Sequence, residues 1–246
     1  MLNELGPGLR LTLVFTILTG LFYPAVMTGV SELLFPKHAK GSLVSVNGKV
    51  VGSSLIGQSF SKPEYFHPRP SAAGNGYDAT ASGGTNLGPT STKLLRGTTK
   101  MDDKGKEIVD FDGISLRVVH YCVENNIPYE SSRPLDSFKD SEGNLDDVKL
   151  IDAFNDTQSP LIFRAKEPIP QDAVTGSSSG LDPHISPANA EAQTARVAKA
   201  RNVRPEQVKA LILEFTDRAD WGFLGEPRVN VLLLNVALDQ KFPVSK

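Results

Sequence analysis

The apolar residues of this chain are concentrated near its start. Residues 11–31 form an uncharged, mostly apolar stretch with the sequence LTLVFTILTGLFYPAVMTGVS. About twenty such residues, at 1.5 Å each, are enough to cross a hydrocarbon core of about 30 Å. A cleaved signal peptide has a shorter apolar run and a small-residue cleavage site, and the following segment SELLFPKHAKG offers no such site. We therefore predict a retained transmembrane helix over residues 11–35, preceded by a short tail of residues 1–10.

Behind this segment the pattern changes to short β-rich and helical stretches. Two β-rich runs between Ser42 and Gly57 flank the pair Asn47-Gly48, which is a strong signal for a tight β-hairpin. Between two charged, turn-rich segments, the stretch GISLRVVHYCVENN predicts a short helix or a strand. This middle region, residues 97–166, has the character of a peripheral excursion from the main domain.

The last sixty residues are more regular. Ser186 is a good N-cap and Pro187 suits a first helical turn, which predicts an Ala-rich helix to about Arg201. A second helix is predicted from Pro205, with apolar residues recurring on one face. The run VNVLLLNVAL, residues 229–238, predicts a buried strand or a strand that passes into a short helix. The hairpin, the helix pair and the late strand together indicate an α+β domain over residues 36–246.

The segment from Gln58 to Thr92 is dense in Gly, Pro, Ser, Asn and Asp, yet it also contains four aromatic residues. Flexible Gly/Ser linkers rarely interleave aromatic residues in this way. A long ordered loop that wraps a surface is the better interpretation, and long ordered loops in compact domains are often functional.

Composition narrows the chemistry. The formal net charge of −2 argues against a nucleic-acid partner, because binding a phosphate backbone needs a basic face. Cys122 is the single cysteine, so neither an intrachain disulfide nor a cysteine metal site can form. The histidines show no ligand spacing, and we predict no metal site; these are His38, His67, His120 and His184.

Three loop segments could carry chemistry. The glycines of SGGTNLGP, residues 82–89, could present backbone N–H groups to an anion, although an ordinary turn-rich loop fits them better. Asp182 and His184 suggest a hydrolytic site, but a catalytic base and its carboxylate normally come from separate elements, so we expect none. Arg69, held between two prolines, could bind a partner's carboxylate or form a salt bridge inside the domain.

Four strings in order resemble one family. They are GSSLIGQSF from Gly52, YFHPRPSAAGNGYDATASGGTNLGPT from Tyr65, GLDPHISPANAEAQTARVAKAR from Gly180, and FLGEPRVNVLLLNVALD from Phe223. Together with the anchor ahead of them, they resemble the C chain of the bacterial potassium-transporting ATPase, the Kdp system. Residues 97–166 match nothing in that pattern, which predicts an insertion.

The resemblance implies a non-catalytic accessory subunit of an ATP-driven, high-affinity potassium uptake complex. Its partners would be a channel-like potassium-binding chain and a P-type ATPase chain, and the resemblance leaves room for a small single-span chain. The subunit is implied to be needed for assembly and to raise the ATP affinity of the ATPase chain as a catalytic chaperone. No cofactor is expected on this chain itself, because ATP with magnesium is used by the partner ATPase chain.

The resemblance also implies a location in the bacterial inner membrane, with a cytoplasmic N-terminus and an extracytoplasmic domain. Lysines after the anchor lean weakly the other way. Four residues match stretches that have been compared with nucleotide-binding signatures, namely Ser82, Gly83, Gly84 and Gln193. Since an extracytoplasmic domain cannot touch cytoplasmic ATP, we expect instead that the loop from Tyr65 to Pro89 docks on the channel-like chain. The expected contacts are Tyr65, Arg69, Tyr77 and Asp78.

A reading from another class stays open at this stage. The chain could be a stand-alone membrane-anchored binding protein or hydrolase that works outside the membrane. The presence of neighbouring genes for a multi-span channel-like chain and a P-type ATPase would separate the two readings.

Overall fold

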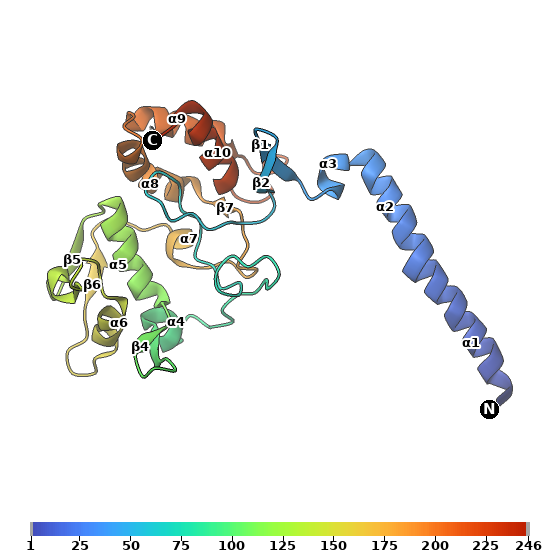
Figure 1. Ribbon diagram of the computed structural model, residues 1–246, viewed down its shortest axis with the longest axis horizontal. Coiled ribbons are helices and arrows are strands. Elements are labelled where there is room, and N and C mark those ends of the chain that lie inside the picture. The colour runs from blue at the N-terminus through green and yellow to red at the C-terminus, as the bar shows by residue number, and fades with distance from the viewer. Residues whose placement is uncertain (1, 245–246) are drawn as a thin grey trace. The chain divides into compact units, whose positions relative to one another are not determined.

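The computed structural model describes residues 2–244 and divides into an N-terminal unit that ends at Leu55 and a second unit that begins at Ile56 (Figure 1). The N-terminal unit begins with α1 (Leu2–Ile17), a π-helical turn η1 (Leu18–Phe22) and α2 (Tyr23–Leu34). These form one helix, of which Glu4–Leu34 is long and apolar enough to span a membrane. It begins earlier than the predicted residues 11–35.

The π-helical turn lies directly before Pro24. The N–H of Tyr23 donates to the carbonyl of Leu18, five residues back, instead of four. Proline has no N–H and its ring collides with the preceding turn, so a wider turn at this point relieves the clash. The hydroxyl of Thr19 donates to the carbonyl of Phe15 at 2.7 Å and satisfies a further backbone group.

The N-terminal unit ends in α3 (Pro36–Ala39) and a hairpin of β1 (Leu43–Val46) and β2 (Lys49–Ser53). Asn47 and Gly48 have φ values of 51° and 77°. A two-residue turn with both φ values positive matches the right-handed twist of the paired strands. The predicted hairpin is therefore confirmed.

The second unit combines helices with short antiparallel strand pairs, which confirms the α+β class. Its elements in chain order are α4 (Thr92–Arg96), β3 (Thr98–Met101), β4 (Glu107–Phe111), α5 (Gly113–Asn125), β5 (Tyr129–Ser131), η2 (Leu135–Phe138), α6 (Asp147–Asn155), β6 (Phe163–Ala165), α7 (Gln171–Val174), β7 (His184–Ile185), α8 (Pro187–Ala200), α9 (Pro205–Glu214), β8 (Thr216–Asp217), β9 (Arg228–Asn230) and α10 (Val231–Lys241). Strands β3–β4 and β5–β6 form two-stranded sheets, and β9 lies between β7 and β8 in a three-stranded sheet.

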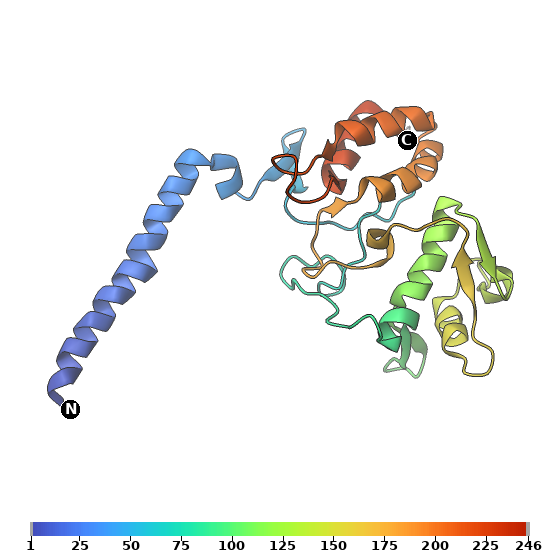
Figure 2. The ribbon, with the colours of Figure 1, turned by 180° about the vertical axis from the view of Figure 1, so that it is seen from behind.

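Two hydrophobic cores organise this unit. The first, which we call the C-terminal lobe, is built from α8, α9, α10, β7 and β9, and it also takes in Phe66. The second, the middle lobe, is built by residues within 97–166, chiefly from α5 and α6. Figures 1 and 2 both show these helix groups at two ends of the unit, with residues 58–91, here called the long loop, running between them.

The helix and strand predictions for the second unit have mixed outcomes. Helices α8 and α9 begin at Pro187 and Pro205 as predicted, and GISLRVVHYCVENN forms the helix α5 rather than a strand. The strand prediction for residues 229–238 is wrong beyond Asn230, where α10 begins; only the alternative of a strand passing into a helix is correct. The Asn230 side chain caps this helix by accepting from the N–H of Leu233 at 3.1 Å. Helix α10 is apolar almost all round, so its sequence lacks the periodicity that separates a helix from a buried strand.

Candidate functional site

The long loop contains no helix or strand among the described residues, yet buried side chains hold its backbone. Asn235 of α10 pairs with both backbone groups of Phe66. Its Oδ1 accepts from the Phe66 N–H at 2.8 Å, and its Nδ2 donates to the Phe66 carbonyl at 3.0 Å. The Phe66 ring is fully buried in the core of the C-terminal lobe. A pair of this kind replaces the missing strand neighbour and orders the loop locally.

Gln193 of α8 makes the same kind of pair one residue further on. Its Oε1 accepts from the His67 N–H at 2.7 Å and its Nε2 donates to the His67 carbonyl at 3.0 Å. The second Nε2 hydrogen goes to Asn189 Oδ1 and the second Oε1 lone pair accepts from Arg196. All four hydrogen-bonding positions of this side chain are thus used, and it is only 1% exposed.

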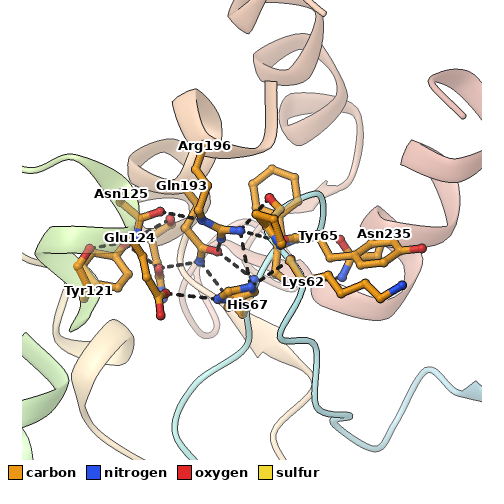
Figure 3. A network of polar contacts seen from close by, with 12 residues as sticks. Lys62, Tyr65, His67, Tyr121, Glu124, Asn125, Gln193, Arg196 and Asn235 are labelled. Carbon is orange, nitrogen blue, oxygen red and sulfur yellow. Dashed lines mark hydrogen bonds and ion pairs between the residues drawn. The ribbon is translucent and has the colours of Figure 1, made fainter. Parts of the chain in front are cut away.

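Arg196, one helical turn further along α8, is the centre of the network (Figure 3). Its guanidinium donates to the carbonyls of Pro63 and Tyr65 at 2.8 and 2.9 Å. It also donates to Asn125 Oδ1 at 3.0 Å and Gln193 Oε1 at 2.6 Å. The residue is 7% exposed, so these contacts replace water at a buried charge.

Arg201, which follows α8 directly, holds the loop from a second side. Its guanidinium donates to the carbonyl of Glu64 at 2.7 Å, to the carbonyl of Phe242 at 2.9 Å and to Asp239 at 2.8 Å. Its guanidinium also lies 5.0 Å from the centre of the Tyr65 ring. The two arginines together tie three consecutive loop carbonyls, those of residues 63–65, to the C-terminal lobe.

Side chains of α5 connect the middle lobe to the same network. Glu124 Oε2 lies 3.4 Å from His67 Nδ1. Burial alone would raise the pKa of the Glu124 carboxyl, but the contacts with His67 and the charge of Arg196 hold that pKa below its usual value. The Tyr121 hydroxyl donates to Asn189 Oδ1 at 2.8 Å. The network therefore joins both lobes, directly between α5 and α8 and also through His67 of the long loop.

A titratable pair within the middle lobe makes a pH-dependent contribution to stability. His120 Nε2 lies 2.7 Å from Asp147 Oδ1. This hydrogen bond raises the pKa of the His120 imidazole, against the opposing effect of burial. Because the folded-state pKa is raised, the stabilisation is fully present below the unfolded-state pKa of about 6.5 and is lost as the pH rises through the folded-state pKa.

We expect the variant Asp147→Asn to be less stable than the wild type at acidic pH, by no more than about 1 kcal/mol because both side chains are partly exposed. The difference should shrink as the pH rises above about 6.5 and through the raised pKa of His120. Urea unfolding at several pH values measures it. A difference that grows with pH would contradict the assignment.

The segment SGGTNLGP, residues 82–89, here called the glycine loop, packs against the segment 177–180. The N–H of Gly83 and the hydroxyl of Ser82 both donate to the carbonyl of Ser179, at 2.9 and 3.0 Å. A Cβ built on Gly84 would lie 2.9 Å from the Ser178 carbonyl oxygen. Close approach of two backbones thus accounts for Gly84, and the Gly83 N–H is already donated within the protein. Gln193 lies in the network described above, so the four predicted nucleotide-related residues do not share a single donor cluster.

The four predicted docking residues play different parts. Arg69 Nη1 lies 3.0 Å from Asp182 Oδ2 and its other nitrogens donate to carbonyls of residues 175 and 176, which is the internal salt bridge foreseen as the alternative. The Tyr77 hydroxyl donates to the Arg69 carbonyl, and burial raises its pKa. The Tyr65 hydroxyl donates to Asp239. Asp78 is exposed and accepts from the N–H and hydroxyl of the nearby Thr80.

The hydrolase-like segment does not assemble a triad. The Asp182 carboxylate accepts from Arg69 and from the N–H of His184, while His184 Nδ1 lies 3.5 Å away from it. The hydroxyl of Ser186 donates to Asp172 and not to the imidazole. Asp182 therefore acts as a turn and salt-bridge residue rather than as the orienting carboxylate of a catalytic histidine.

Sequence reasoning missed Arg196, Arg201 and Asn235, which hold the loop. It also missed Asn189, which accepts from Gln193 and Tyr121. A signal for three network residues was present in the predicted helix. Asn189, Gln193 and Arg196 recur at spacings of four and three residues, which places them on one helical face. Polar residues at core spacing indicate a buried polar network rather than a solvated face.

Comparison with known proteins gives one consistent result. A family model described as "K+-transporting ATPase, c chain" matches residues 5–110 and 141–240. The protein named potassium-transporting ATPase KdpC subunit of Mycobacterium tuberculosis is 42% identical over 240 residues, which cover 98% of this chain and 100% of the relative. Proteins with the same name from Beijerinckia indica and Rhodospirillum rubrum are each 40% identical to this chain, over 246 and 245 residues. The alignments cover 98% of the first relative and 100% of the second. The family model leaves out residues 111–140, and the extent of an insertion within residues 97–166 stays a prediction.

Proposed function

Because this chain belongs to the family of the c chain of the K+-transporting ATPase, we propose that its long loop is the surface that docks on a partner chain of that complex. The chain is a non-catalytic accessory subunit of a Kdp potassium uptake complex. Its N-terminal apolar helix fits a membrane-anchored protein. The partners we propose are the channel-like chain and the P-type ATPase chain.

The observation that supports docking is the way the long loop is held. Its base, around Phe66 and His67, is fixed by paired hydrogen bonds from α8 and α10. Residues 78–82 are all exposed. A loop whose backbone is ordered in advance loses little conformational entropy on binding, so it offers an effective docking surface.

Arg69 and Tyr77 take a supporting role in this proposal. Both are engaged inside the domain, with Asp182 and with the Arg69 carbonyl. They set the shape of the loop, while Asp78 and its exposed neighbours make the contact. Tyr65 remains a proposed contact at the edge of the same surface.

We further propose that the domain lies outside the membrane and that the N-terminus lies in the cytoplasm. In that arrangement an influence on the ATP affinity of the ATPase chain passes through the partner chains. Such a coupling free energy is typically about 1–3 kcal/mol. The proposal that any effect on ATP affinity is indirect is supported by Gln193 and Gly83, whose hydrogen-bonding groups described above are used inside the domain.

A bulky residue on the exposed part of the loop tests the docking proposal. We expect Ala79→Trp to reduce co-purification of this chain with its partners by about tenfold or more, because a buried interface does not accommodate a large added side chain. The free chain should keep its stability, since Ala79 is exposed. Affinity purification of the complex from native membranes measures the effect.

A matched control is Gln158→Trp, which adds the same side chain at an exposed position in the middle lobe. We expect the control to co-purify normally. Equal recovery of the Ala79→Trp complex would contradict docking through the long loop. ATP labelling of the purified chain that is abolished by changing Gly83 or Gln193, or protease mapping of the domain to the cytoplasm, would favour direct nucleotide binding instead.

A further inference from the structure

An apolar tip projects from the C-terminal lobe between β8 and β9. Trp221, Phe223 and Leu224 are 85%, 74% and 46% exposed, although large apolar side chains normally lie inside a domain. Every residue from 217 to 227 except Ala219 is exposed. The fold and the loop network described above make no use of these three side chains.

The tip is a closed turn rather than a loose loop. The N–H of Asp220 donates to the Leu224 carbonyl at 2.8 Å, and the N–H of Leu224 donates back to the Asp220 carbonyl at 2.9 Å. Trp221 has a φ of +54° and Gly222 a φ of +84°. A left-handed conformation is costly for a bulky residue such as tryptophan. The backbone thus holds the indole outward at a cost in strain, which favours a role for its exposure.

We propose that this tip inserts into the headgroup region of the bilayer in which the chain is anchored. Tryptophan is enriched at membrane–water interfaces, because its ring is apolar and its N–H still reaches water. Phenylalanine and leucine are the apolar residues that accompany it in interfacial segments. The proposal rests on the retained anchor helix and holds for either orientation of the domain.

The length of the connection keeps the tip near a membrane. Residues 35–55 link the apolar helix to the second unit. Even fully extended, these residues span no more than roughly 75 Å. The bilayer is therefore within reach of the second unit.

The size and charge of the tip favour lipid over a protein partner. Three side chains on one narrow turn are far fewer than the roughly 20–30 residues that each side of a standard protein interface contributes. The flanking charges are of both signs, and Arg228 lies 3.4 Å from Asp220. The remaining charges at the tip are Asp217, Arg218 and Glu226. Because no net positive charge gathers here, we expect insertion to occur in neutral lipid as well as in anionic lipid.

Trp221 is the single tryptophan of the chain, so its fluorescence reports the tip alone. The full chain is placed in phosphatidylcholine vesicles whose acyl chains are either plain or brominated close to the headgroup. We expect a blue-shifted emission in plain lipid and loss of most of the fluorescence in brominated lipid. Bromine quenches only at short range, so tethering near the surface without insertion should leave the emission unquenched.

Two variants make the test specific. Changing Phe223→Asp and Leu224→Asp together retains the reporter and should abolish quenching. The control Leu213→Asp changes a 77% exposed leucine on α9 and should leave quenching intact. Circular dichroism checks that both variants fold.

The outcomes separate the tip from the anchor. Flotation of the chain with vesicles is measured first, and a chain that does not float overturns the anchor and the proposal with it. A chain that floats but is not quenched overturns the tip alone. A photo-crosslinking residue at position 221 is also tested in the complex in native membranes. If it labels another chain of the complex, a protein and not lipid covers the tip, and the proposal is overturned.

Discussion

Replacing Arg196 by methionine is expected to lower the free energy of unfolding by at least about 3 kcal/mol. The change removes donors from the carbonyls of Pro63 and Tyr65 and from the side chains of Asn125 and Gln193. Each buried acceptor left without a partner costs about 1–3 kcal/mol, although water entering the site would recover part of this. Methionine keeps most of the side-chain volume, so the loss reports the hydrogen bonds rather than a cavity.

Thermal and urea unfolding of the full chain in detergent micelles measure this loss. Arg196→Lys should be intermediate, because an ammonium keeps the charge but cannot reproduce the planar fork of donors. The control Lys199→Ala changes an exposed residue of the same helix and should alter stability by less than about 0.5 kcal/mol. A methionine variant as stable as the wild type would show that the network does not hold the loop.

Replacing Gly180 by alanine is expected to destabilise the protein. Gly180 belongs to the segment 177–180, and the change should disrupt the contact of this segment with the glycine loop. Gly180 has a φ of +67°, and a Cβ there would lie 2.6 Å from the Gly83 carbonyl oxygen and 2.8 Å from the Ala73 nitrogen. Both neighbours are backbone atoms, so the contact cannot be relieved by turning a side chain. We expect a loss of about 3 kcal/mol or more, of which about 1–2 kcal/mol is backbone strain alone.

Gly105→Ala separates the strain from the collision. Gly105 has a φ of +75°, but nothing lies within 4 Å of a Cβ built on it. It should therefore lose only the strain, about 1–2 kcal/mol. Limited proteolysis provides a second readout, since cleavage within residues 71–84 should increase in the Gly180 variant and not in the Gly105 variant. Equal effects of the two changes would argue against tight packing at Gly180.

If the long loop is the docking surface, the two variants also connect stability to assembly. Both Arg196→Met and Gly180→Ala leave every exposed residue of the loop in place. Any loss of co-purification would therefore arise from a loop that is no longer ordered in advance. The Ala79→Trp variant tests the opposite case, in which the loop is ordered but its surface is blocked.

The sequence by itself determined the features that depend on residues close together in the chain. The long apolar helix at the N-terminus follows from the length of one apolar run, the hairpin from Asn47-Gly48, and the starts of α8 and α9 from prolines at the first helical position. Each rests on local geometry that those residue types impose wherever they occur. The resemblance carried by four separated strings identified the family that the comparisons then showed.

Only the tertiary structure decided what the long loop is. Phe66 and His67 are held by hydrogen bonds from Asn235 and Gln193, which lie 169 and 126 positions away in the chain. No local pattern encodes such distant pairs. Tertiary packing also decided that residues 231–241 form a helix, although their mostly apolar sequence allowed a strand. In the folded chain, contacts within the domain also use polar groups that the sequence suggested could bind a partner or a nucleotide. Arg69 forms a salt bridge with Asp182, and Gln193 hydrogen-bonds to the backbone of His67. A buried polar group is stable only when its partners lie within hydrogen-bond reach.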